Sequence, residues 1–241
     1  MKVAAYQMGV DTCYGGDPIA SLRACVRACE AQNVSILCCP EGAIGGLADY
    51  VADPAAIAVP HDSLTTVLAP IASTTVTTVV GVTEQGGANQ WYNTAVVYSR
   101  GEVCGLYRKH HPAIRRSRYT AGNETPVFVV EGLTIGILIC RDSTDRHLAA
   151  ALVARGATVL FIPTNNAMPA DRGGPALAAE ARSIDRQHAR ALGIPIVRAD
   201  VIGDWQGLRS EGASAITTPN GEQVCAGRVQ AGELLVAELM L

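Results

Sequence analysis

Three polar residues with complementary chemistry each follow an apolar, strand-like run of the sequence: Glu41, Lys109 and Cys140. Ligands collect beyond the carboxyl ends of strands in layered α/β proteins, because rigid strands hold side chains there. A base, a cation and a thiol at three such ends form a candidate catalytic constellation. Taken singly, each residue also fits an ordinary role, as a core thiol, a surface lysine or a loop glutamate.

The three side-chain types together suit nucleophilic hydrolysis. A thiol becomes a good nucleophile when it loses its proton, so a base and a positive charge beside Cys140 are expected to lower its pKa. Glu41 could take the thiol proton, return it to a leaving amine, and then activate water against a thioester. Lys109 could orient that carboxylate and stabilise the oxyanion of the tetrahedral intermediate. We therefore expect Cys140 to be the first of the eight cysteines to react with an alkylating reagent.

The elements that must position these residues are a mixture of βαβ-like steps and hairpins. Turns at 100–101, 131–132 and 220–221 are typical of hairpins. The pattern predicts mixed sheets covered by helices, in a single domain over residues 1–241. We expect strands at 3–7, 34–39, 76–82, 94–99, 102–108, 127–130, 133–139, 158–162 and 194–199, and helices at 18–31, 148–154 and 175–192.

Composition sets the broad class. The 241 residues are 49% apolar and 17% charged, which suits one α/β domain with a large core. A net charge of −3 gives no electrostatic footprint for nucleic acid. No apolar run approaches the roughly 18 residues of a membrane span, and the N-terminus lacks a signal-peptide pattern. We expect a cytoplasmic protein whose cysteines are mostly reduced core residues, with no metal, because the Cys25–Cys29 pair has no second pair at zinc-ribbon spacing.

The short sequence motifs around the three residues are more specific than the spacing of the residues, and they occur in a fixed order along the chain. They are Cys39-Pro40-Glu41-Gly42, Tyr107-Arg108-Lys109-His110 and Ile139-Cys140-Arg141-Asp142. In this order they resemble the glutamate, lysine and cysteine motifs of the nitrilase-like carbon–nitrogen hydrolase superfamily. The resemblance covers nearly the whole chain, through Gln7 and the segments 119–122, 157–165, 212–216 and 219–221.

The resemblance implies a four-layer αββα sandwich with two central mixed β-sheets. It implies Glu41 as general base and acid, Lys109 as its charged partner, and Cys140 as the acylated nucleophile. The backbone N–H of Arg141 would complete the oxyanion hole, and Asn165 is a candidate substrate-binding residue. It further implies no cofactor and a homodimer. Amide hydrolysis is the preferred activity, with an N-carbamoyl hydrolase, a nitrilase or a catalytically silent ligand-binding member as alternatives.

Other nucleophile arrangements fit the sequence less well. A Cys–His pair with His110 or His111 as base has no local signature. No G-x-S-x-G word surrounds a serine, and no C-x-x-C word suggests redox chemistry. These patterns favour the glutamate, lysine and cysteine set over a serine hydrolase or a redox protein.

The loop after Lys109 departs from the superfamily pattern. Residues 110–122 contain no acid where many relatives have a second glutamate, and three arginines crowd the loop, Arg115, Arg116 and Arg118. Arginine binds carboxylate bidentately. We therefore hypothesise a substrate with a carboxylate remote from its scissile amide, held by one of these arginines. The helix at 175–192 is apolar on more than one face, which favours burial of a second face in a homodimer.

Overall fold

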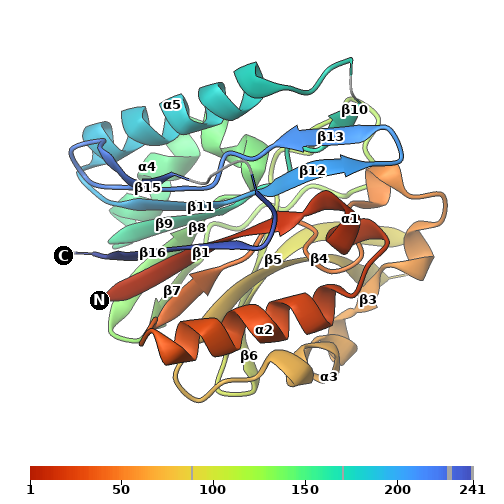
Figure 1. Ribbon diagram of the computed structural model, residues 1–241, viewed down its shortest axis with the longest axis horizontal. Helices are drawn as coiled ribbons and strands as arrows, with labels where there is room; N and C mark the ends of the chain where they lie inside the picture. Colours follow the sequence, from red (N-terminus) through yellow and green to blue (C-terminus); the bar gives the residue numbers. More distant parts are fainter. Residues whose placement is uncertain (88, 170, 227–229, 240–241) are drawn as a thin grey trace.

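Alternate residues of the first strand are buried in different cores, and this alternation explains the layers. In the computed structural model, Val3 and Ala5 of β1 (Lys2–Gly9) belong to a core between two sheets, whereas Ala4 and Tyr6 face a core beneath helices. Side chains of a strand point alternately to its two faces, so a strand apolar on both faces needs a cover on each side. Figure 1 shows the result, an αββα sandwich with helices on both outer faces. The structure describes residues 1–87, 89–169, 171–226 and 230–239.

The first sheet has ten strands in the described part of the chain. Its order is β10-β13-β12-β1-β2-β4-β5-β6, and β16 and β3 pair with β1 and β4. Parallel pairs such as β1–β2 and antiparallel pairs such as β4–β5 both occur, so the sheet is mixed. The strands after β1 are β2 (Ile36–Cys38), β3 (Val59–Pro60), β4 (Thr77–Gly87), β5 (Gln90–Ser99), β6 (Glu102–Arg108), β10 (Met168–Pro169), β12 (Val201–Trp205), β13 (Leu208–Glu211) and β16 (Glu233–Glu238).

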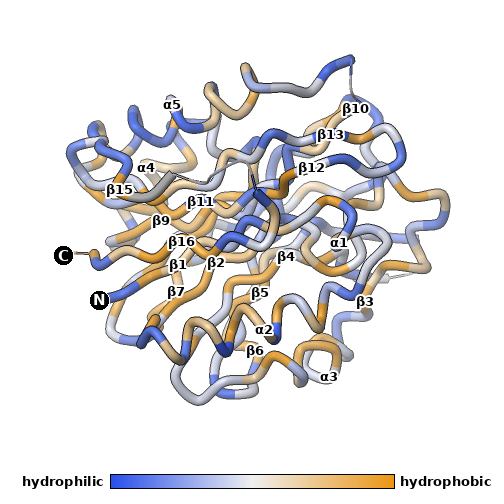
Figure 2. Tube along the Cα trace, viewed as in Figure 1, coloured by the Kyte–Doolittle hydropathy of each residue, from blue (hydrophilic) through white to orange (hydrophobic). Residues whose placement is uncertain are grey.

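The second sheet has six strands within the described ranges, in the order β15-β14-β11-β9-β8-β7. It too is mixed, because β8, β9 and β11 run parallel while β7 and β14 pair antiparallel with their neighbours. Its strands are β7 (Val127–Val130), β8 (Leu133–Ile137), β9 (Val159–Pro163), β11 (Ile196–Ala199), β14 (Ala215–Thr217) and β15 (Gln223–Ala226). Figure 2 shows the hydrophobic residues concentrated along the central strands of both sheets.

Helices cover the two outer faces. Asp17 caps α2 (Pro18–Ala31) by accepting from Ala20 N at 2.9 Å, and Gly193 ends α5 (Pro175–Leu192) in the left-handed conformation. The other helices are α1 (Val10–Tyr14), α3 (Leu64–Leu68), α4 (Arg146–Ala154) and the 3₁₀ turns η1 (Ala48–Tyr50), η2 (Pro54–Ala56), η3 (His61–Ser63), η4 (Ala69–Ile71) and η5 (Cys140–Thr144). Among the helices so described, none combines the length and the apolar character of a membrane span.

Most predicted elements are present, with three differences that matter. The strand predicted at 133–139 ends at Ile137, because the chain turns into η5 at Cys140. The hairpin of β12 and β13 was not predicted, although Gln206 and Gly207 at its turn both have positive φ. Strand β16 was not predicted either, since its pairing with β1 joins opposite ends of the chain. The predicted hairpins at 100–101, 131–132 and 220–221 are confirmed.

Candidate active site

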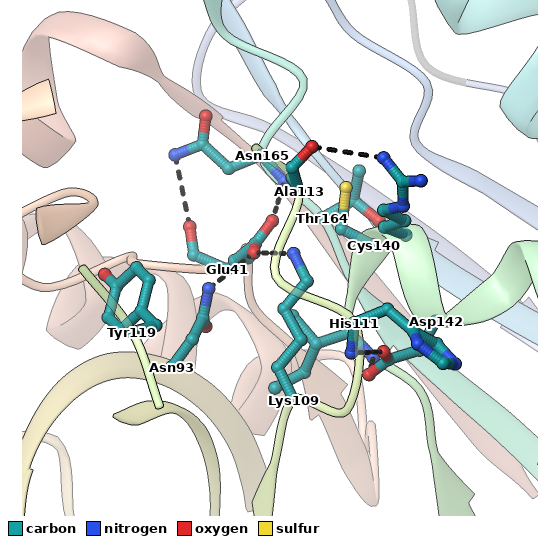
Figure 3. A network of polar contacts seen from close by, with 12 residues as sticks. Glu41, Asn93, Lys109, His111, Ala113, Tyr119, Cys140, Asp142, Thr164 and Asn165 are labelled. Atoms are coloured by element: carbon teal, nitrogen blue, oxygen red, sulfur yellow. Dashed lines mark hydrogen bonds and ion pairs between the residues drawn. The ribbon is translucent and has the colours of Figure 1, made fainter. Parts of the chain in front are cut away.

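Glu41, Lys109 and Cys140 come together from both sheets. Glu41 follows β2 and Lys109 follows β6, both in the ten-stranded sheet, whereas Cys140 begins η5 just after β8 of the six-stranded sheet. Figure 3 shows the Glu41 carboxylate, the Lys109 ammonium and the Cys140 sulfur gathered around one space. The site therefore lies where the ends of the two sheets meet, as the positions at strand ends predicted.

The Glu41 carboxylate is buried, with 1% exposure, and is fixed by three donors. Its Oε1 accepts from Lys109 Nζ at 2.5 Å and from Asn93 Nδ2 at 2.6 Å, and its Oε2 accepts from Asn165 N at 2.9 Å. Charge-assisted hydrogen bonds of this kind hold a carboxylate in one orientation. Glu41 is thus set as a base or acid at a defined position.

The Lys109 ammonium is held by its buried position beside Glu41. Burial opposes its charge, but the Glu41 carboxylate, with Cys140 and Asp142, raises the pKa of Lys109 above its ordinary value. The backbone of Lys109 is also fixed, because its carbonyl accepts from Gly122 N at 2.8 Å. Lys109 therefore carries a proton at neutral pH and cannot act as the base.

The backbone at Cys140 is strained. Its φ is +46°, a left-handed conformation that costs a non-glycine residue about 1–3 kcal/mol unless its surroundings hold it. Ser143 Oγ donates to the Cys140 carbonyl at 2.7 Å, and the buried Asp142 carboxylate accepts from Tyr107 Oη at 2.8 Å and His111 N at 2.8 Å. These contacts hold the loop that presents the sulfur.

The Cys140 thiol has a raised pKa, contrary to the expectation from sequence. Although Cys140 is partly exposed to a cavity, desolvation of its sulfur raises the pKa to about 12. The Glu41 carboxylate raises it further, while Lys109 and Arg198 act in the opposite direction. Burial of the sulfur, which cannot be read from the sequence, outweighs the two cations here. The free protein therefore holds a thiol at neutral pH, and attack on a substrate requires a base to take the proton.

A cavity of about 280 Å³ opens above Cys140. Its walls are largely apolar, from Ala113, Met168, Leu177 and Ile184, with charged groups at Arg141, Glu180 and Arg198. A second cavity of about 20 Å³, lined by Glu41 and Lys109, shares Ala113, Asn165 and Met168 with the first. The nucleophile, base and cation thus face adjoining spaces with room for a small molecule.

The other residues proposed from sequence lie at different distances from the site, and only some of them line its cavities. Asn165 lines both cavities, and Arg141 lines the larger one while its Nη1 donates to Ala113 O at 3.1 Å. Arg115 and Arg116 are exposed and line neither of these cavities. Arg118 is held by the carbonyl of Val51 at 2.8 Å. The arginines that line the larger cavity are Arg141 and Arg198, and both lie outside the arginine-rich loop.

Several apolar residues of α5 contact other parts of this chain. Ala178 and Ala181 pack with Ala213, Ala189 is in the core beneath the helix, Leu192 packs against that core, and Ile184 lines the larger cavity. The burial of Ala178, Ala181 and Ala189 is thus accounted for within one chain, and the homodimer on this helix stays a prediction.

Sequence reasoning missed three residues of the site: Asn93, Glu180 and Arg198. Asn93 and Arg198 each interrupt an apolar strand, and a buried polar side chain in such a run needs a partner. That signal could have marked both. Glu180 had no such signal, since an acid on a helix surface is ordinary.

Comparison with known proteins decides the family. The model of the carbon-nitrogen hydrolase family matches residues 2–241. This chain belongs to the carbon-nitrogen hydrolase family. The chain is 30% identical over 186 residues to a nitrilase of Pyrococcus abyssi, a match that covers 76% of this chain and 67% of the nitrilase. It is 32% identical over 168 residues to the N-carbamoylputrescine amidase of Solanum lycopersicum, a match covering 64% of this chain and only 56% of that protein.

Solved structures of the nitrilase superfamily share the fold. An amidase from Nesterenkonia sp. AN1 superposes with a TM-score of 0.81 at 22% identity, covering 100% of this chain and 93% of the amidase. At this level of identity the likeness concerns the fold, and it confirms the expected nitrilase-like sandwich.

Proposed function

We propose that this carbon-nitrogen hydrolase is a small-molecule amidase that works through a thioester on Cys140. The observation that carries the proposal is the position of Glu41, a buried carboxylate locked by Lys109 and Asn93 in a space that adjoins the cavity above Cys140. A raised thiol pKa makes such a base necessary, and a buried base can meet the proton directly.

The first half of the reaction forms the thioester. Cys140 Sγ attacks the amide carbon as Glu41 takes the thiol proton, and the C=O electron pair moves onto oxygen. The Lys109 ammonium and the Arg141 N–H stabilise this oxyanion, because N–H groups in the first turn of a helix lack an intrahelical acceptor. Glu41 then gives its proton to the amine, the C–N bond breaks, and the acyl group stays on sulfur.

The second half returns the free enzyme. Water enters the position that the amine leaves, and Glu41 takes one of its protons as the oxygen attacks the thioester carbon. The C–S bond breaks, the carboxylic acid leaves, and sulfur regains the proton from Glu41. One carboxylate thus serves both halves, which agrees with the fixed orientation that its three donors give it.

Amides are the preferred substrates among the alternatives. The Nesterenkonia protein is described as an amidase with an active-site cysteine, and the Solanum relative acts as an N-carbamoylputrescine amidase. An N-carbamoyl compound or a nitrile would use the same three residues, so both stay as second candidates. A ligand-binding member without catalysis is the remaining alternative.

The proposed substrate carries a carboxylate away from its scissile amide. The support is Arg141, whose guanidinium lines the cavity and uses Nη1 on a neutral carbonyl, Ala113 O. That leaves donors for a carboxylate oxygen. Arg141 thus takes the role that the sequence suggested for Arg115, Arg116 or Arg118. We also propose a cytoplasmic homodimer, for which the support is the superfamily resemblance.

The experiment that tests the function is a panel of primary amides, N-carbamoyl compounds and nitriles, read out by ammonia release. We expect the amides to be turned over fastest and Glu41→Gln to lower kcat by about 10²–10⁴-fold, the usual contribution of a general base. Turnover of every compound at the uncatalysed rate would favour the ligand-binding alternative. Wild-type activity in Glu41→Gln would refute the assigned base.

A further inference from the structure

Arg198 is a buried cation that the proposed reaction does not use directly. It lies in β11, and its side chain is 1% exposed. Asp185 of α5 binds it through two parallel contacts, Nε to Oδ2 at 2.7 Å and Nη2 to Oδ1 at 2.6 Å. Because taking both charges out of water is costly, a buried ion pair of this kind is weak evidence for stability and suggests another role.

One branch of the guanidinium holds the nucleophile loop. Arg198 Nη2 donates to Ser143 Oγ at 3.0 Å, and Ser143 Oγ donates in turn to the Cys140 carbonyl at 2.7 Å. The Ser143 carbonyl is also bound, by His188 Nε2 of α5 at 2.7 Å. The residue beyond the strained Cys140 turn is thus fixed at its side chain and its backbone.

The other branch holds the loop that binds the base. Arg198 Nη1 donates to Thr164 Oγ1 at 2.7 Å. The Thr164 carbonyl accepts from Glu41 N at 3.3 Å, and the next residue, Asn165, donates its N–H to Glu41 Oε2 at 2.9 Å. The Arg198 guanidinium therefore joins the loop that presents Cys140 to the loop that binds Glu41.

We propose that Arg198 is a positioning residue that fixes Cys140 relative to Glu41, through Ser143 on one side and Thr164 on the other. The inference rests on the proposed roles of Cys140 and Glu41. Arg198 also lines the cavity above Cys140, where its charge favours the thiolate. A shift of about 1 Å between nucleophile and base can cost about 10²-fold in rate, so such a link matters for turnover.

The test replaces the ion pair by apolar residues in Asp185→Leu/Arg198→Met, which avoids leaving either charge buried and unpaired. We expect kcat to fall about 10²-fold while KM changes less than about threefold. The pH midpoint for modification of Cys140 by methyl methanethiosulfonate, a thiolate reagent without an amide, should rise. Arg198 lowers the pKa of Cys140 and lines its cavity, whereas Asp185, which is removed with it, does not line that cavity. Arg186→Met is the matched control, because Arg186 lies on α5 like Asp185 but binds Gln223 of β15, and it should change neither quantity.

A second pair of variants separates position from charge. Ser143→Ala and Thr164→Val keep the ion pair, so both should lower kcat but leave the pH midpoint near that of the wild type. Ser143→Ala should add little to the loss in Asp185→Leu/Arg198→Met, because both changes cut the same link. Wild-type kcat in both single variants would overturn the proposal even if the double variant fails to fold.

The two proposals fail differently. If the wild type hydrolyses no amide, the proposed function is wrong. The modification of Cys140 still reports on Arg198, and an unchanged pH midpoint in a folded double variant would then overturn the electrostatic part of the inference.

Discussion

The Cys140 thiol should react as a buried thiol of high pKa in the absence of substrate. With a pKa of about 12, about one molecule in 10⁴ is ionised at about pH 8, whereas a cysteine of pKa about 8.5 is about one quarter ionised there. Modification of Cys140 by methyl methanethiosulfonate should therefore accelerate about tenfold per pH unit between about pH 7 and pH 10. At neutral pH the exposed Cys104 should be modified before Cys140, which reverses the order expected from sequence.

Two substitutions should move this profile in opposite directions. Glu41 raises the pKa of Cys140, so Glu41→Gln removes a negative charge and should shift the midpoint to lower pH. Lys109 lowers that pKa, so Lys109→Met should shift the midpoint to higher pH. Both substitutions should nevertheless abolish most amide hydrolysis. If Glu41→Gln reacts faster at Cys140 but hydrolyses amides more slowly, the loss of turnover comes from the missing base and not from a weaker nucleophile.

The assay follows Cys140 by peptide mass spectrometry across pH, with Cys104 as an internal reference thiol. A wild-type rate that levels off below about pH 9 would show that burial does not dominate the pKa. Shifts of the same sign in Glu41→Gln and Lys109→Met would show that their charges do not act on the sulfur. Either result would refute the electrostatic reasoning.

Three further predictions concern stability and specificity. Glu41→Gln or Lys109→Met alone should lower the free energy of unfolding, measured by urea denaturation, by about 3–5 kcal/mol. The double variant should recover part of that loss, whereas additive losses would mean that the pair is not coupled. Gly122→Ala should lower Tm and activity together, because a Cβ there would lie 2.2 Å from a backbone oxygen of β6; an unchanged Tm would contradict the packing. An ω-amide with a free carboxylate should have a kcat/KM about tenfold higher than its methyl ester, a difference of about 1.4 kcal/mol. This preference should be lost in Arg141→Met and kept in Arg115→Met. Equal rates for acid and ester in the wild type would refute carboxylate recognition.

The parts of the site that lie at strand ends were predictable from sequence. The strand before Glu41 is apolar on both faces, and its end was readable where the polar residue begins. The strand before Lys109 followed from the hairpin turn at 100–101, and both residues were placed correctly after their strands. The mixed sheets followed from hairpin turns such as that at 131–132, because these signals are local. The end of β8 was placed two residues late, since an apolar run does not tell where a chain leaves the sheet.

The parts that depend on distant contacts were not predictable. Arg198 and Asp185 lie on different elements, and their pairing follows from how α5 packs over the six-stranded sheet (Figure 1). The direction of the Cys140 pKa depends on burial, which the sequence does not give. In the arginine-rich loop, closeness in sequence was misleading. Three arginines near Lys109 suggested a substrate contact, but Arg115 and Arg116 line neither cavity of the site.

The most direct test of the central claim is to identify the acyl-enzyme. The wild type is mixed with a primary amide, quenched with acid within the first turnover, and mapped by peptide mass spectrometry. A thioester mechanism predicts an acyl group on Cys140, with the mass of the amide minus ammonia. It also predicts a loss of about 10⁴-fold or more in ammonia release by Cys140→Ala. An acyl group on another side chain, or wild-type ammonia release by Cys140→Ala, would contradict it.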